Sequence, residues 1–463
     1  MKTDLLIIGG TAAGTAAAAS ARRADPQANI LLVESGGDVS YSTCEMPMYA
    51  GGSIDERSDL VRYSPERFAD TFSVDVRPHT TITGFSTDRK EALIDGDTNT
   101  IRFGSLILAT GARAVMPEVL MPAASNVHVL RTLSDADAVR TAIDTEGGSL
   151  HHAVIVGGGY VGLEVAHALR EKDVRVTLVQ PEGHVLRSGI HAGLAKLVTA
   201  RMEQTGVSVR HARVTGADRS SDGRVLALST DDGEKIGCQF VLVATGIVPR
   251  TDLAMQLGIR LDTGGAILVN DQMRTNKPGI WACGDAVMVP DVVTGAPVWA
   301  PLAMQAYRTG RVAGTNAVSG RGARAASKPA KIEPVVPTYA VHCFGLDIAH
   351  AGMRVEEALA AGFKARACDI TGASHSRLLG GSDVHIRLVF DDASGRVLGA
   401  ETVGRAGTAL RMNVVAALMR LRGTVNDLAA ADTVYHPLVA PMHDPLRVAA
   451  SEAQKMRNRS EWD

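Results

Sequence analysis

Two glycine-rich segments, each set between an apolar strand and a helix, constrain the fold of this chain more than any other feature. The first runs from Gly9 to Gly14, and the second runs from Gly157 to Gly162. In each case an apolar strand precedes the glycines, and a helix and a second strand follow. Glycines permit a tight strand-to-helix turn and a close approach of a pyrophosphate to the helix amino terminus. The sequence therefore predicts an α/β fold with two βαβ dinucleotide-binding units.

The first unit carries an acidic residue where a ribose is expected. The loop before its helix consists of Gly9, Gly10, Thr11, Ala12, Ala13 and Gly14. Its second strand ends at Glu34, and a carboxylate there can accept hydrogen bonds from the ribose of a dinucleotide. The order of strand, glycines, helix, strand and acid indicates a nucleotide site rather than only the packing of a helix on a strand.

The second unit has a complete G-x-G-x-x-G sequence but no acid at the end of its second strand. The residues expected to contact its nucleotide are Gly157, Gly159, Tyr160, Val161, Gly162 and Glu164. Gln180 stands at the position of the acid, so no carboxylate favours a free 2′-hydroxyl there. Arg187 could meet a 2′-phosphate, although an arginine at this place also suits NADH. These residues favour NADPH, or the use of both nucleotides, and leave NADH as the alternative.

A short motif at the end of a strand occurs twice and indicates an internal duplication. Ala109-Thr110-Gly111 ends one apolar run, and Ala244-Thr245-Gly246 ends another. Small residues at a strand end let the backbone approach a ligand closely. Asp285, which follows a glycine, can accept a hydrogen bond from a sugar-like hydroxyl.

Cys44 supplies the reactive atom in this interpretation. It lies in the polar loop Tyr41–Pro47, beyond the first βαβ unit, where α/β nucleotide-binding folds place reacting groups. The alternative is a packed structural thiol, because free cysteine usually behaves as a small buried hydrophobe. Cys238 and Cys283 stand in apolar, strand-like segments and fit that structural alternative.

Composition excludes several kinds of protein. The net charge of -2 gives no electrostatic basis for binding nucleic acid or an anionic membrane. The 5 cysteines are scattered without a C-x-x-C pair, which fits neither a disulfide framework nor a metal site and suits a reducing cytoplasm. No apolar run is long enough to span a membrane. The chain enters a strand at once, so we expect no signal peptide.

The last third of the chain carries no glycine-rich nucleotide motif. Residues 319–331 are rich in Gly, Ala, Ser and basic residues and predict a linker. Beyond it, Tyr339–Met353 and Val384–Gly404 are strand-rich, Asp391–Gly395 has a hairpin composition, and Leu410–Leu421 is expected to be helical. We therefore expect a separate α+β domain in this 463-residue chain.

Taken in order, these motifs resemble those of the FAD-dependent pyridine nucleotide–disulfide oxidoreductases over essentially the whole chain. Tyr49 stands five residues after Cys44, where two-cysteine members carry their second thiol, so the chain is similar to the single-cysteine branch. That branch contains coenzyme A disulfide reductases, NADH peroxidases and water-forming NADH oxidases. Further matching segments are Arg22-Arg23, Ser64–Phe68, Cys283-Gly284-Asp285 and Pro301-Leu302-Ala303.

The resemblance implies two Rossmann-like three-layer domains and a carboxy-terminal α+β dimerisation domain, as in glutathione reductase. It implies an FAD domain over residues 1–115 and 245–320, an NAD(P)H domain over 116–244 and an interface domain over 332–463. Further cofactor contacts would be Ile82, Ala109, Thr110, Gly111, Gly246, Asp285 and Ala303. It also implies a homodimer in which the carboxy-terminal domain completes the active site of the partner.

Departures from the branch leave the substrate open. Leu378 or Leu379 and Val439 occupy the positions of tyrosines that act in the coenzyme A disulfide reductases. His436, in a His-Pro pair, resembles instead the acid–base histidine of the two-cysteine reductases, and His443 is the reserve candidate.

These features predict an enzyme that passes electrons from NAD(P)H through FAD and Cys44 to a small disulfide or persulfide, for example a coenzyme A disulfide. We expect the helix that follows Pro47, together with the flavin, to lower the pKa of the Cys44 thiol. Arg22, Arg62 and Arg67 could receive an anionic substrate, although arginines often only solvate a helix face.

Three other functions stay possible at this point. An NADH oxidase or peroxidase would cycle Cys44 through a sulfenic acid, although the peroxidases carry a histidine where Ala12 stands. A flavin-dependent electron-transfer reductase would need no cysteine, and such enzymes lack the Cys44 loop. A flavoprotein without enzymatic activity fits poorly with two nucleotide sites.

Overall fold

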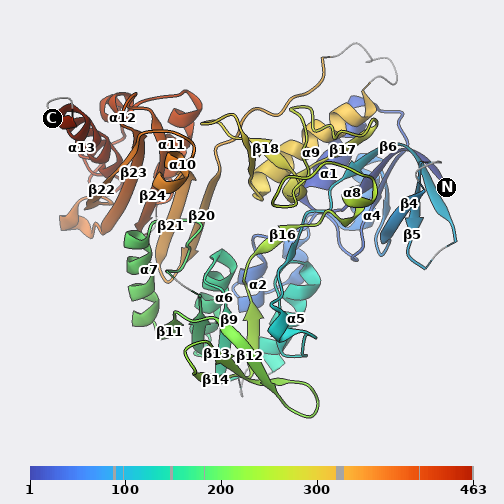
Figure 1. Ribbon diagram of the computed structural model, residues 1–463, viewed down its shortest axis with the longest axis horizontal. Helices are drawn as coiled ribbons and strands as arrows, with labels where there is room; N and C mark the ends of the chain where they lie inside the picture. The colour runs from blue at the N-terminus through green and yellow to red at the C-terminus, as the bar shows by residue number, and fades with distance from the viewer. Residues whose placement is uncertain are drawn as a thin grey trace.

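The computed structural model describes residues 1–86, 90–96, 98–145, 150–181, 183–319, 328–405 and 407–460. Three large sheets, each with its own helices, occupy separate regions of the molecule (Figure 1). Of the linker expected over 319–331, residues 320–327 lie outside the described residues. Within the described ranges, no helix is long and apolar enough to cross a membrane.

The first sheet is assembled from distant parts of the chain. Its order is β3-β2-β1-β6-β5-β4, and β17 also pairs with β6. Its strands are β1 (Lys2–Ile8), β2 (Ile30–Val33), β3 (Asp75–Arg77), β4 (Ile82–Ser86), β5 (Glu91–Ile94), β6 (Thr100–Leu108) and β17 (Ile280–Ala282). Since β1 is parallel to β2 and β6, and β6 to β17, the carboxyl ends of these strands meet at one edge. That edge is where an open α/β sheet binds ligands.

Two helices with small residues pack on the first sheet in close mutual contact. They are α1 (Ala12–Ala24) and α9 (Ala303–Val318). A Cβ added at Gly310 would lie 2.2 Å from the carbonyl oxygen of Ala13, and one at Gly314 would lie 2.0 Å from that of Ala17. The small side chains therefore let the two helix backbones touch, and this contact fixes the amino terminus of α1 against the sheet edge.

The second sheet is parallel throughout, in the order β11-β10-β9-β15-β8. Its strands are β8 (Val127–His128), β9 (His152–Val156), β10 (Arg175–Val179), β11 (Val207–Arg210) and β15 (Phe240–Val243). Its helices are α5 (Leu133–Thr145), α6 (Tyr160–Glu171) and α7 (Ala192–Gln204). A small antiparallel sheet follows, made of β12 (Val214–Arg219), β13 (Val225–Thr230) and β14 (Lys235–Gly237).

The two glycine-rich loops have nearly the same geometry, which confirms the duplication expected from the repeated motifs. Gly9 has φ of 110°, and a Cβ on it would lie 2.2 Å from the carbonyl oxygen of Ala109. Gly157 has φ of 113°, and a Cβ on it would lie 2.2 Å from the carbonyl oxygen of Ala244. In both units the loop thus touches the first residue of an Ala-Thr-Gly motif, so both positions require glycine.

The third sheet is antiparallel and has the order β20-β21-β24-β23-β22. Its strands are β20 (Thr338–Cys343), β21 (Leu346–Gly352), β22 (Ala365–Ala373), β23 (Asp383–Asp391) and β24 (Val397–Gly404). Its helices are α10 (Val355–Ala360), α11 (Arg411–Arg420), α12 (Val425–Ala430) and α13 (Pro445–Ser460). The expected α+β region, its hairpin between β23 and β24 and its helix near residue 411 are confirmed.

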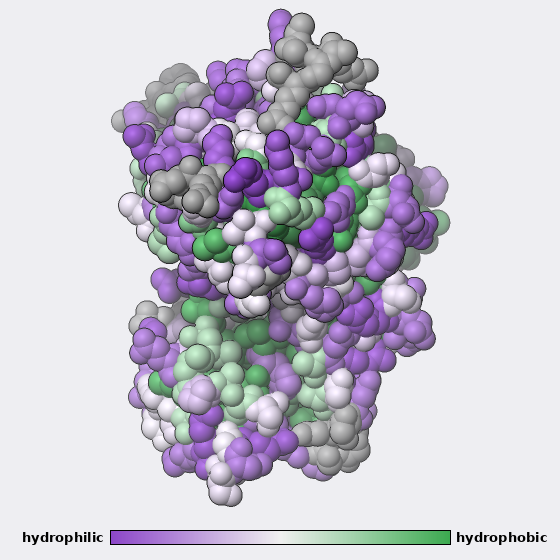
Figure 2. Space-filling model, turned by 90° about the vertical axis from the view of Figure 1, so that its right-hand side faces the viewer, coloured by the Kyte–Doolittle hydropathy of each residue, from purple (hydrophilic) through white to green (hydrophobic). Residues whose placement is uncertain are grey.

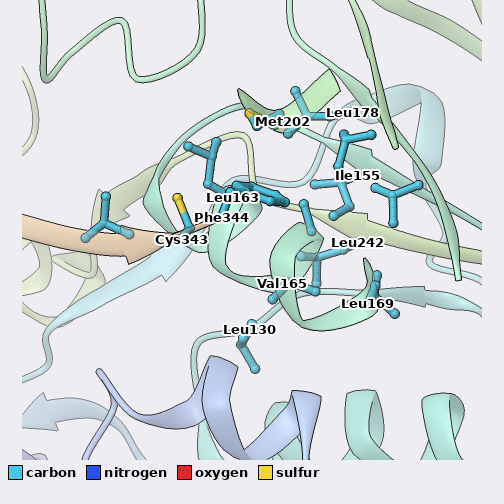
Figure 3. Close-up of a cluster of buried hydrophobic side chains, with 14 of the residues drawn as sticks. Leu130, Ile155, Leu163, Val165, Leu169, Leu178, Met202, Leu242, Cys343 and Phe344 are labelled. Atoms are coloured by element: carbon cyan, nitrogen blue, oxygen red, sulfur yellow. The ribbon is translucent and has the colours of Figure 1, made fainter. Parts of the chain in front are cut away.

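One face of the third sheet shares a hydrophobic core with the second unit. Cys343 and Phe344, at the turn between β20 and β21, lie among Ile155 and Leu163 of the second unit (Figure 3). The opposite face packs against α11, α12 and α13. The carboxy-terminal region is therefore joined to the second unit by a core rather than by a surface contact.

Shorter elements connect the three regions, and the molecule narrows between its upper and lower lobes (Figure 2). The antiparallel pair β7 (Ala112–Ala114) and β16 (Ile247–Pro249) runs between the first two units. The other short elements are α2 (Met46–Gly51), α3 (Arg57–Leu60), α4 (Pro65–Phe72), α8 (Asp252–Gln256), β18 (Met288–Pro290), β19 (Pro297–Trp299), η1 (Glu118–Leu120), η2 (Gly284–Ala286) and η4 (Arg377–Leu379). The expected fold class, two Rossmann-like units with a carboxy-terminal α+β region, is confirmed.

Candidate active site

A cavity of about 470 Å³ lies at the carboxyl edge of the first sheet. The residues expected from the sequence that line it are Gly9, Thr11, Glu34, Ile82, Ala109, Thr110 and Gly111. Tyr41 and Thr43, from the loop that carries Cys44, line the same cavity. The first nucleotide unit and the cysteine loop therefore share one site.

Glu34 holds the first glycine loop in place. Its Oε2 accepts a hydrogen bond from the Gly10 N–H at 2.7 Å, and its Oε1 accepts one from the Gly36 N–H at 3.0 Å. A Cβ added at Gly14 would lie 1.8 Å from the carbonyl oxygen of Gly9, so the loop and the start of α1 are in direct contact. A carboxylate beside a glycine cradle at a helix amino terminus fits the ribose and pyrophosphate of the expected dinucleotide.

Arg131 is a site residue that the sequence did not reveal. It lines the cavity, its Nη2 donates to Asp285 Oδ2 at 2.6 Å, and its Nε donates to the Ala112 carbonyl oxygen at 3.1 Å. Asp285, expected to meet a sugar-like hydroxyl, is thus ion-paired within the chain. Arg131 precedes α5 in a stretch without a motif, so only the fold brings it to the cavity.

Cys44 lies between the cavity and the start of α2. Its side chain is exposed in the single chain, whereas Cys238, Cys283, Cys343 and Cys368 are buried. The structural role expected for Cys238 and Cys283 is confirmed by their positions in apolar cores. Cys44 is therefore the one free thiol that a small molecule can reach.

The expectation of a lowered pKa for Cys44 is wrong for the chain itself. Although the side chain reaches solvent, the surrounding protein desolvates the sulfur and raises its pKa, and a hydrogen bond with Thr43 opposes this only in part. The charges of Glu164, Asp285 and Glu45 raise the pKa further. The helix after Cys44, α2, is short, so its amino terminus does not outweigh burial and three carboxylates.

Gln180 takes the same place in the second unit that Glu34 takes in the first. Its Oε1 accepts a hydrogen bond from the Gly158 N–H at 2.6 Å, and its Nε2 donates to the Pro181 carbonyl oxygen at 3.1 Å. The Arg187 side chain is exposed in the turn that follows β10. The second unit therefore offers a neutral amide and an exposed arginine where a ribose acid would otherwise stand.

The other residues expected in the second unit surround the start of α6. Gly159 is the N-cap of α6, Tyr160 is its first residue, and Val161 packs against the core shared with the third sheet. A Cβ added at Gly162 would lie 2.2 Å from the carbonyl oxygen of Gly157. Glu164, one turn into α6, is largely buried, and burial raises its pKa to about 7.

Glu164→Gln is expected to lower the pKa of the Cys44 thiol. Near the pH at which a thiol titrates, Glu164 is ionised, and its negative charge disfavours the thiolate. The pH at which iodoacetamide alkylates Cys44 at half its maximal rate should therefore fall, as followed by mass spectrometry of the flavin-loaded protein. Glu203→Gln, at an exposed position of α7, is the matched control. An unshifted profile would remove Glu164 from the surroundings of the thiol.

Three expected residues lie in supporting positions. The carbonyl oxygen of Gly246, which has φ of 117°, accepts a hydrogen bond from the Val115 N–H at 3.0 Å where the chain passes between the units. Ala303 is exposed at the first position of α9. Ala12 is the first residue of α1 and is also exposed.

His436 lies in an exposed turn of the carboxy-terminal region. Its Nδ1 accepts a hydrogen bond from the Leu438 N–H at 3.3 Å. Apolar side chains around it are also exposed, namely Val434, Tyr435, Leu438, Val439 and Met442. The reserve candidate His443 is exposed as well. Among the described residues, no hydrogen bond or ion pair links His436 to the Cys44 loop of the same chain.

The three candidate substrate arginines differ in their contacts. The Arg22 guanidinium donates to the carbonyl oxygens of Phe72, Asp25, Pro26 and Ser73. Arg62 has an exposed side chain, and its backbone N–H donates to the Ser40 carbonyl oxygen at 2.9 Å, beside the cysteine loop. The exposed Arg67 guanidinium lies 5.4 Å from the centroid of the Tyr63 ring. Arg22 is thus occupied by the backbone, whereas Arg62 and Arg67 face solvent.

Two family models together match most of the chain. The model of the pyridine nucleotide-disulphide oxidoreductases matches residues 3–310. The model of the dimerisation domain of these enzymes matches residues 338–445.

Three relatives are similar in sequence to this chain over almost its whole length. The chain is 30% identical over 455 residues to the NAD(P)H sulfur oxidoreductase (CoA-dependent) of Pyrococcus abyssi, which covers 97% of this chain and 98% of the relative. It is 25% identical over 460 residues to the coenzyme A disulfide reductase of Staphylococcus haemolyticus, covering 98% and 99%. It is 28% identical over 463 residues to an NADH oxidase of Methanocaldococcus jannaschii, covering 97% and 98%.

Two solved structures of similarly named enzymes have nearly the same fold as this chain. The reduced CoADR-RHD of Bacillus anthracis has a TM-score of 0.91 and 28% identity, covering 99% of this chain and 81% of that chain. The NAD-dependent persulfide reductase from A. fulgidus has a TM-score of 0.91 and 30% identity, covering 99% and 84%.

The resemblance stated from the motifs is confirmed, and with it an oxidoreductase that uses FAD and NAD(P)H. Both glycine loops, the cavity and the carboxy-terminal sheet agree with that assignment. The chain belongs to the pyridine nucleotide-disulphide oxidoreductase family.

Proposed function

We propose that this protein is an NAD(P)H-dependent flavoprotein that reduces a low-molecular-weight disulfide or persulfide, with Cys44 as its redox-active thiol. The observation that carries the proposal is the position of the cysteine loop. Tyr41 and Thr43 line the cavity of the first unit, and the charge of Glu164, from the second unit, acts on Cys44. The thiol thus lies where the two nucleotide units meet. The names of the sulfur oxidoreductase and coenzyme A disulfide reductase relatives support this substrate class.

In this proposal the first unit holds FAD and the second unit holds NAD(P)H. Glu34 receives a ribose, the Gly9–Gly14 loop receives the pyrophosphate, and Arg131, held by Asp285, lines the cavity beside them. When bound, FAD supplies two-electron transfer between a nicotinamide and a sulfur. The corresponding division of the chain is residues 1–115 with 245–320 for FAD, 116–244 for NAD(P)H and 332–463 for the interface.

The overall reaction consumes one NAD(P)H and one proton for each sulfur–sulfur bond that is broken. A disulfide yields two thiols, and a persulfide yields a thiol and hydrogen sulfide. The Cys44 thiolate attacks one sulfur of the substrate, a mixed disulfide forms, and the other sulfur leaves as a thiolate that takes up a proton. Two electrons from NAD(P)H then cleave the mixed disulfide, which returns Cys44 to its thiolate and releases the second thiol.

We propose that His436 of the partner subunit supplies the proton in a homodimer. Imidazole titrates near neutral pH and suits this transfer. Support comes from the match to a dimerisation domain over residues 338–445 and from the exposed apolar side chains beside His436, such as Val439 at 68% exposure. A contiguous exposed apolar patch is typical of an interaction surface.

His436→Ala is expected to lower kcat for disulfide reduction by about 10² or more. If the site is shared, a mixed dimer of Cys44→Ser and His436→Ala subunits contains one intact site and has about half the wild-type activity, because its Cys44 and His436 come from different chains. The measurement uses differently tagged subunits purified as mixed dimers. A mixed dimer as inactive as both parents would contradict the shared site, and His443→Ala is the control for the reserve residue.

For an anionic substrate such as a coenzyme A disulfide, we propose Arg62 and Arg67 as the receiving residues and leave Arg22 out. Arg62 and Arg67 are both exposed, and the Arg62 backbone contacts Ser40 beside the cysteine loop, whereas Arg22 is bound to backbone carbonyls. The neutral Gln180 and the exposed Arg187 favour NADPH or both nucleotides.

Five free cysteines and no disulfide suit the reducing cytoplasm in which we place the enzyme.

The proposal is tested by oxidising NADPH or NADH without oxygen in the presence of coenzyme A disulfide, glutathione disulfide, cystine and their persulfides. We expect at least one of these compounds to be reduced, with thiol formed in proportion to the nucleotide consumed. The NADH oxidase relative supplies the second candidate. Turnover that needs oxygen, and that none of the sulfur compounds supports, would assign the chain to that function instead.

A further inference from the structure

A row of polar side chains crosses the third sheet on the face that packs against the second unit. Each lies directly opposite the next on a neighbouring strand, in the order Tyr339, His350, Glu401, Arg387 and Asp369. The rings of Tyr339 and His350 are 5.2 Å apart, and Arg387 pairs with Asp369 at 2.5 Å. Glu401 is 1% exposed, whereas the Asp369 side chain is 63% exposed. The row thus leads from the junction between the regions to solvent.

Two hydrogen bonds join this region to residues 184–191, which follow β10 in the second unit. Arg354 Nη1 donates to the Arg187 carbonyl oxygen at 2.9 Å. The His191 N–H donates to Glu401 Oε2 at 2.5 Å. The chain is therefore tied to the carboxy-terminal region at Arg187 and again at His191.

Between these bonds, Gly189 faces two tyrosines from different regions. A Cβ on Gly189 would lie 2.2 Å from the Tyr339 hydroxyl oxygen and 2.4 Å from that of Tyr160. The Tyr339 and Tyr160 rings are 4.5 Å apart. Tyr160 is the first residue of α6, directly after the second glycine loop. One tyrosine of the third sheet therefore contacts both the glycine loop and the turn after β10.

On the basis of the NAD(P)H site proposed above, we propose that Tyr339, Arg354 and Glu401 form a brace that positions the nicotinamide nucleotide site of their own chain. The brace holds Tyr160 at the pyrophosphate loop and residues 184–191 at the ribose end. The carboxy-terminal region thus has a role within each chain, in addition to any contact between subunits. Tyr339 is a positioning residue, since it acts on the nucleotide through Tyr160 and Gly189.

Buried polar groups lie close together at the centre of the brace. The hydroxyls of Tyr160 and Tyr339 converge on one point beside Gly189, and a side-chain hydrogen bond between them contributes to the pKa of both tyrosines. Removing one hydroxyl would leave the other buried without that partner, which costs free energy. Within the described part of the chain, both ring nitrogens of the neighbouring His350 are buried without a hydrogen-bond partner.

Glu401 makes the brace sensitive to pH. The groups that face it from neighbouring elements are Arg387, Arg354, Glu356, His350, Tyr339, Tyr160 and the His191 N–H. Burial raises the pKa of Glu401 to about 7, whereas burial lowers that of His350 to about 4, so His350 stays neutral near pH 7. An ionised carboxylate accepts a stronger hydrogen bond than a neutral acid, so the bond to His191 tightens as pH rises through 7.

Gly189→Ala tests the brace without altering a residue expected to touch the nucleotide. The φ of Gly189 lies outside the left-handed region, so the backbone accepts alanine, and the nearest atoms that oppose its Cβ belong to the two tyrosines. We expect the Kd of NADP⁺, measured by calorimetry on the flavin-loaded dimer, to rise about tenfold. Gly216→Ala, where an added Cβ lies 3.8 Å from its nearest neighbour in β12–β13, should leave Kd unchanged. Unchanged binding by Gly189→Ala would overturn the proposal.

Two conservative variants keep the test decisive if Gly189→Ala fails to fold. Tyr339→Phe keeps the ring and removes the hydroxyl, so Kd should rise about fivefold with flavin content unchanged. In the wild-type protein the affinity for NAD⁺ should rise between pH 6 and pH 8, as Glu401 ionises. Glu401→Gln should abolish this rise, whereas Asp369→Asn, at the exposed end of the row, should retain it. A wild-type Kd for Tyr339→Phe, or a wild-type pH profile for Glu401→Gln, would overturn the brace. Failure of the wild-type protein to bind either nucleotide would instead overturn the proposed function.

Discussion

Cys44→Ser is expected to abolish NAD(P)H-dependent reduction of disulfides and persulfides, with kcat lowered by about 10³ or more. A serine hydroxyl stays protonated at neutral pH and cannot form the mixed disulfide that the reaction requires. FAD should remain bound, because the cavity is lined by Tyr41 and Thr43 beside the cysteine rather than by Cys44 itself. The measurement combines steady-state turnover with the flavin absorbance of the purified variant.

Cys238→Ala is the matched control for this loss, because Cys238 is buried in a hydrophobic core of the second unit, away from the cavity. The variant should retain turnover. Its free energy of unfolding should be somewhat lower, because the smaller side chain leaves a cavity in the core. Undiminished disulfide reduction by Cys44→Ser would refute the role of the thiol. It would favour the electron-transfer function that needs no cysteine.

Gly9→Ala is expected to yield a protein that has lost most of its flavin. Gly9 has φ of 110°, and an added Cβ would lie 2.2 Å from the carbonyl oxygen of Ala109. The variant therefore meets both backbone strain and an overlap with backbone that no side-chain rotation relieves, a combined cost of about 2 to 5 kcal/mol at the FAD loop. The measurement is the ratio of flavin to protein absorbance after purification.

Gly157→Ala is the paired variant in the second unit, where φ is 113° and an added Cβ would lie 2.2 Å from the carbonyl oxygen of Ala244. The strain now falls on the loop that binds the nicotinamide nucleotide. Flavin content should therefore be normal, and the Kd of NADP⁺ should rise by about two orders of magnitude. Loss of flavin from Gly157→Ala but not from Gly9→Ala would reverse the assignment of the two units. Circular dichroism of both variants separates a local effect from unfolding.

Local sequence patterns predicted the elements that have a local cause. The glycine loops, the acid at Glu34 and the helix at Arg411–Arg420 follow from backbone requirements and hydrophobic period, which short stretches of sequence contain. The match between the loops at Gly9 and Gly157 was visible as a repeat because the same close approach needs the same small residues. The fold class was predictable for the same reason.

Features that depend on distant residues were not predictable from the sequence. Arg131 reaches Asp285 only because the chain crosses between units and returns. Tyr339 meets Tyr160 only because the third sheet packs on the second unit. In the chain itself the pKa of Cys44 is raised, first because the surrounding protein desolvates the sulfur and then because Glu164 and Asp285, far away in sequence, oppose the thiolate.

The central claim is that Cys44 exchanges an electron pair with NAD(P)H and a sulfur substrate. The most direct measurement is an oxygen-free titration with NADPH, or with NADH, of protein first treated with the small disulfide that it reduces best and then freed of excess disulfide. We predict that the wild-type protein takes up one more electron pair per chain than Cys44→Ser and releases one thiol per chain as it does so. Equal uptake by the two proteins, with no thiol released, would contradict the account.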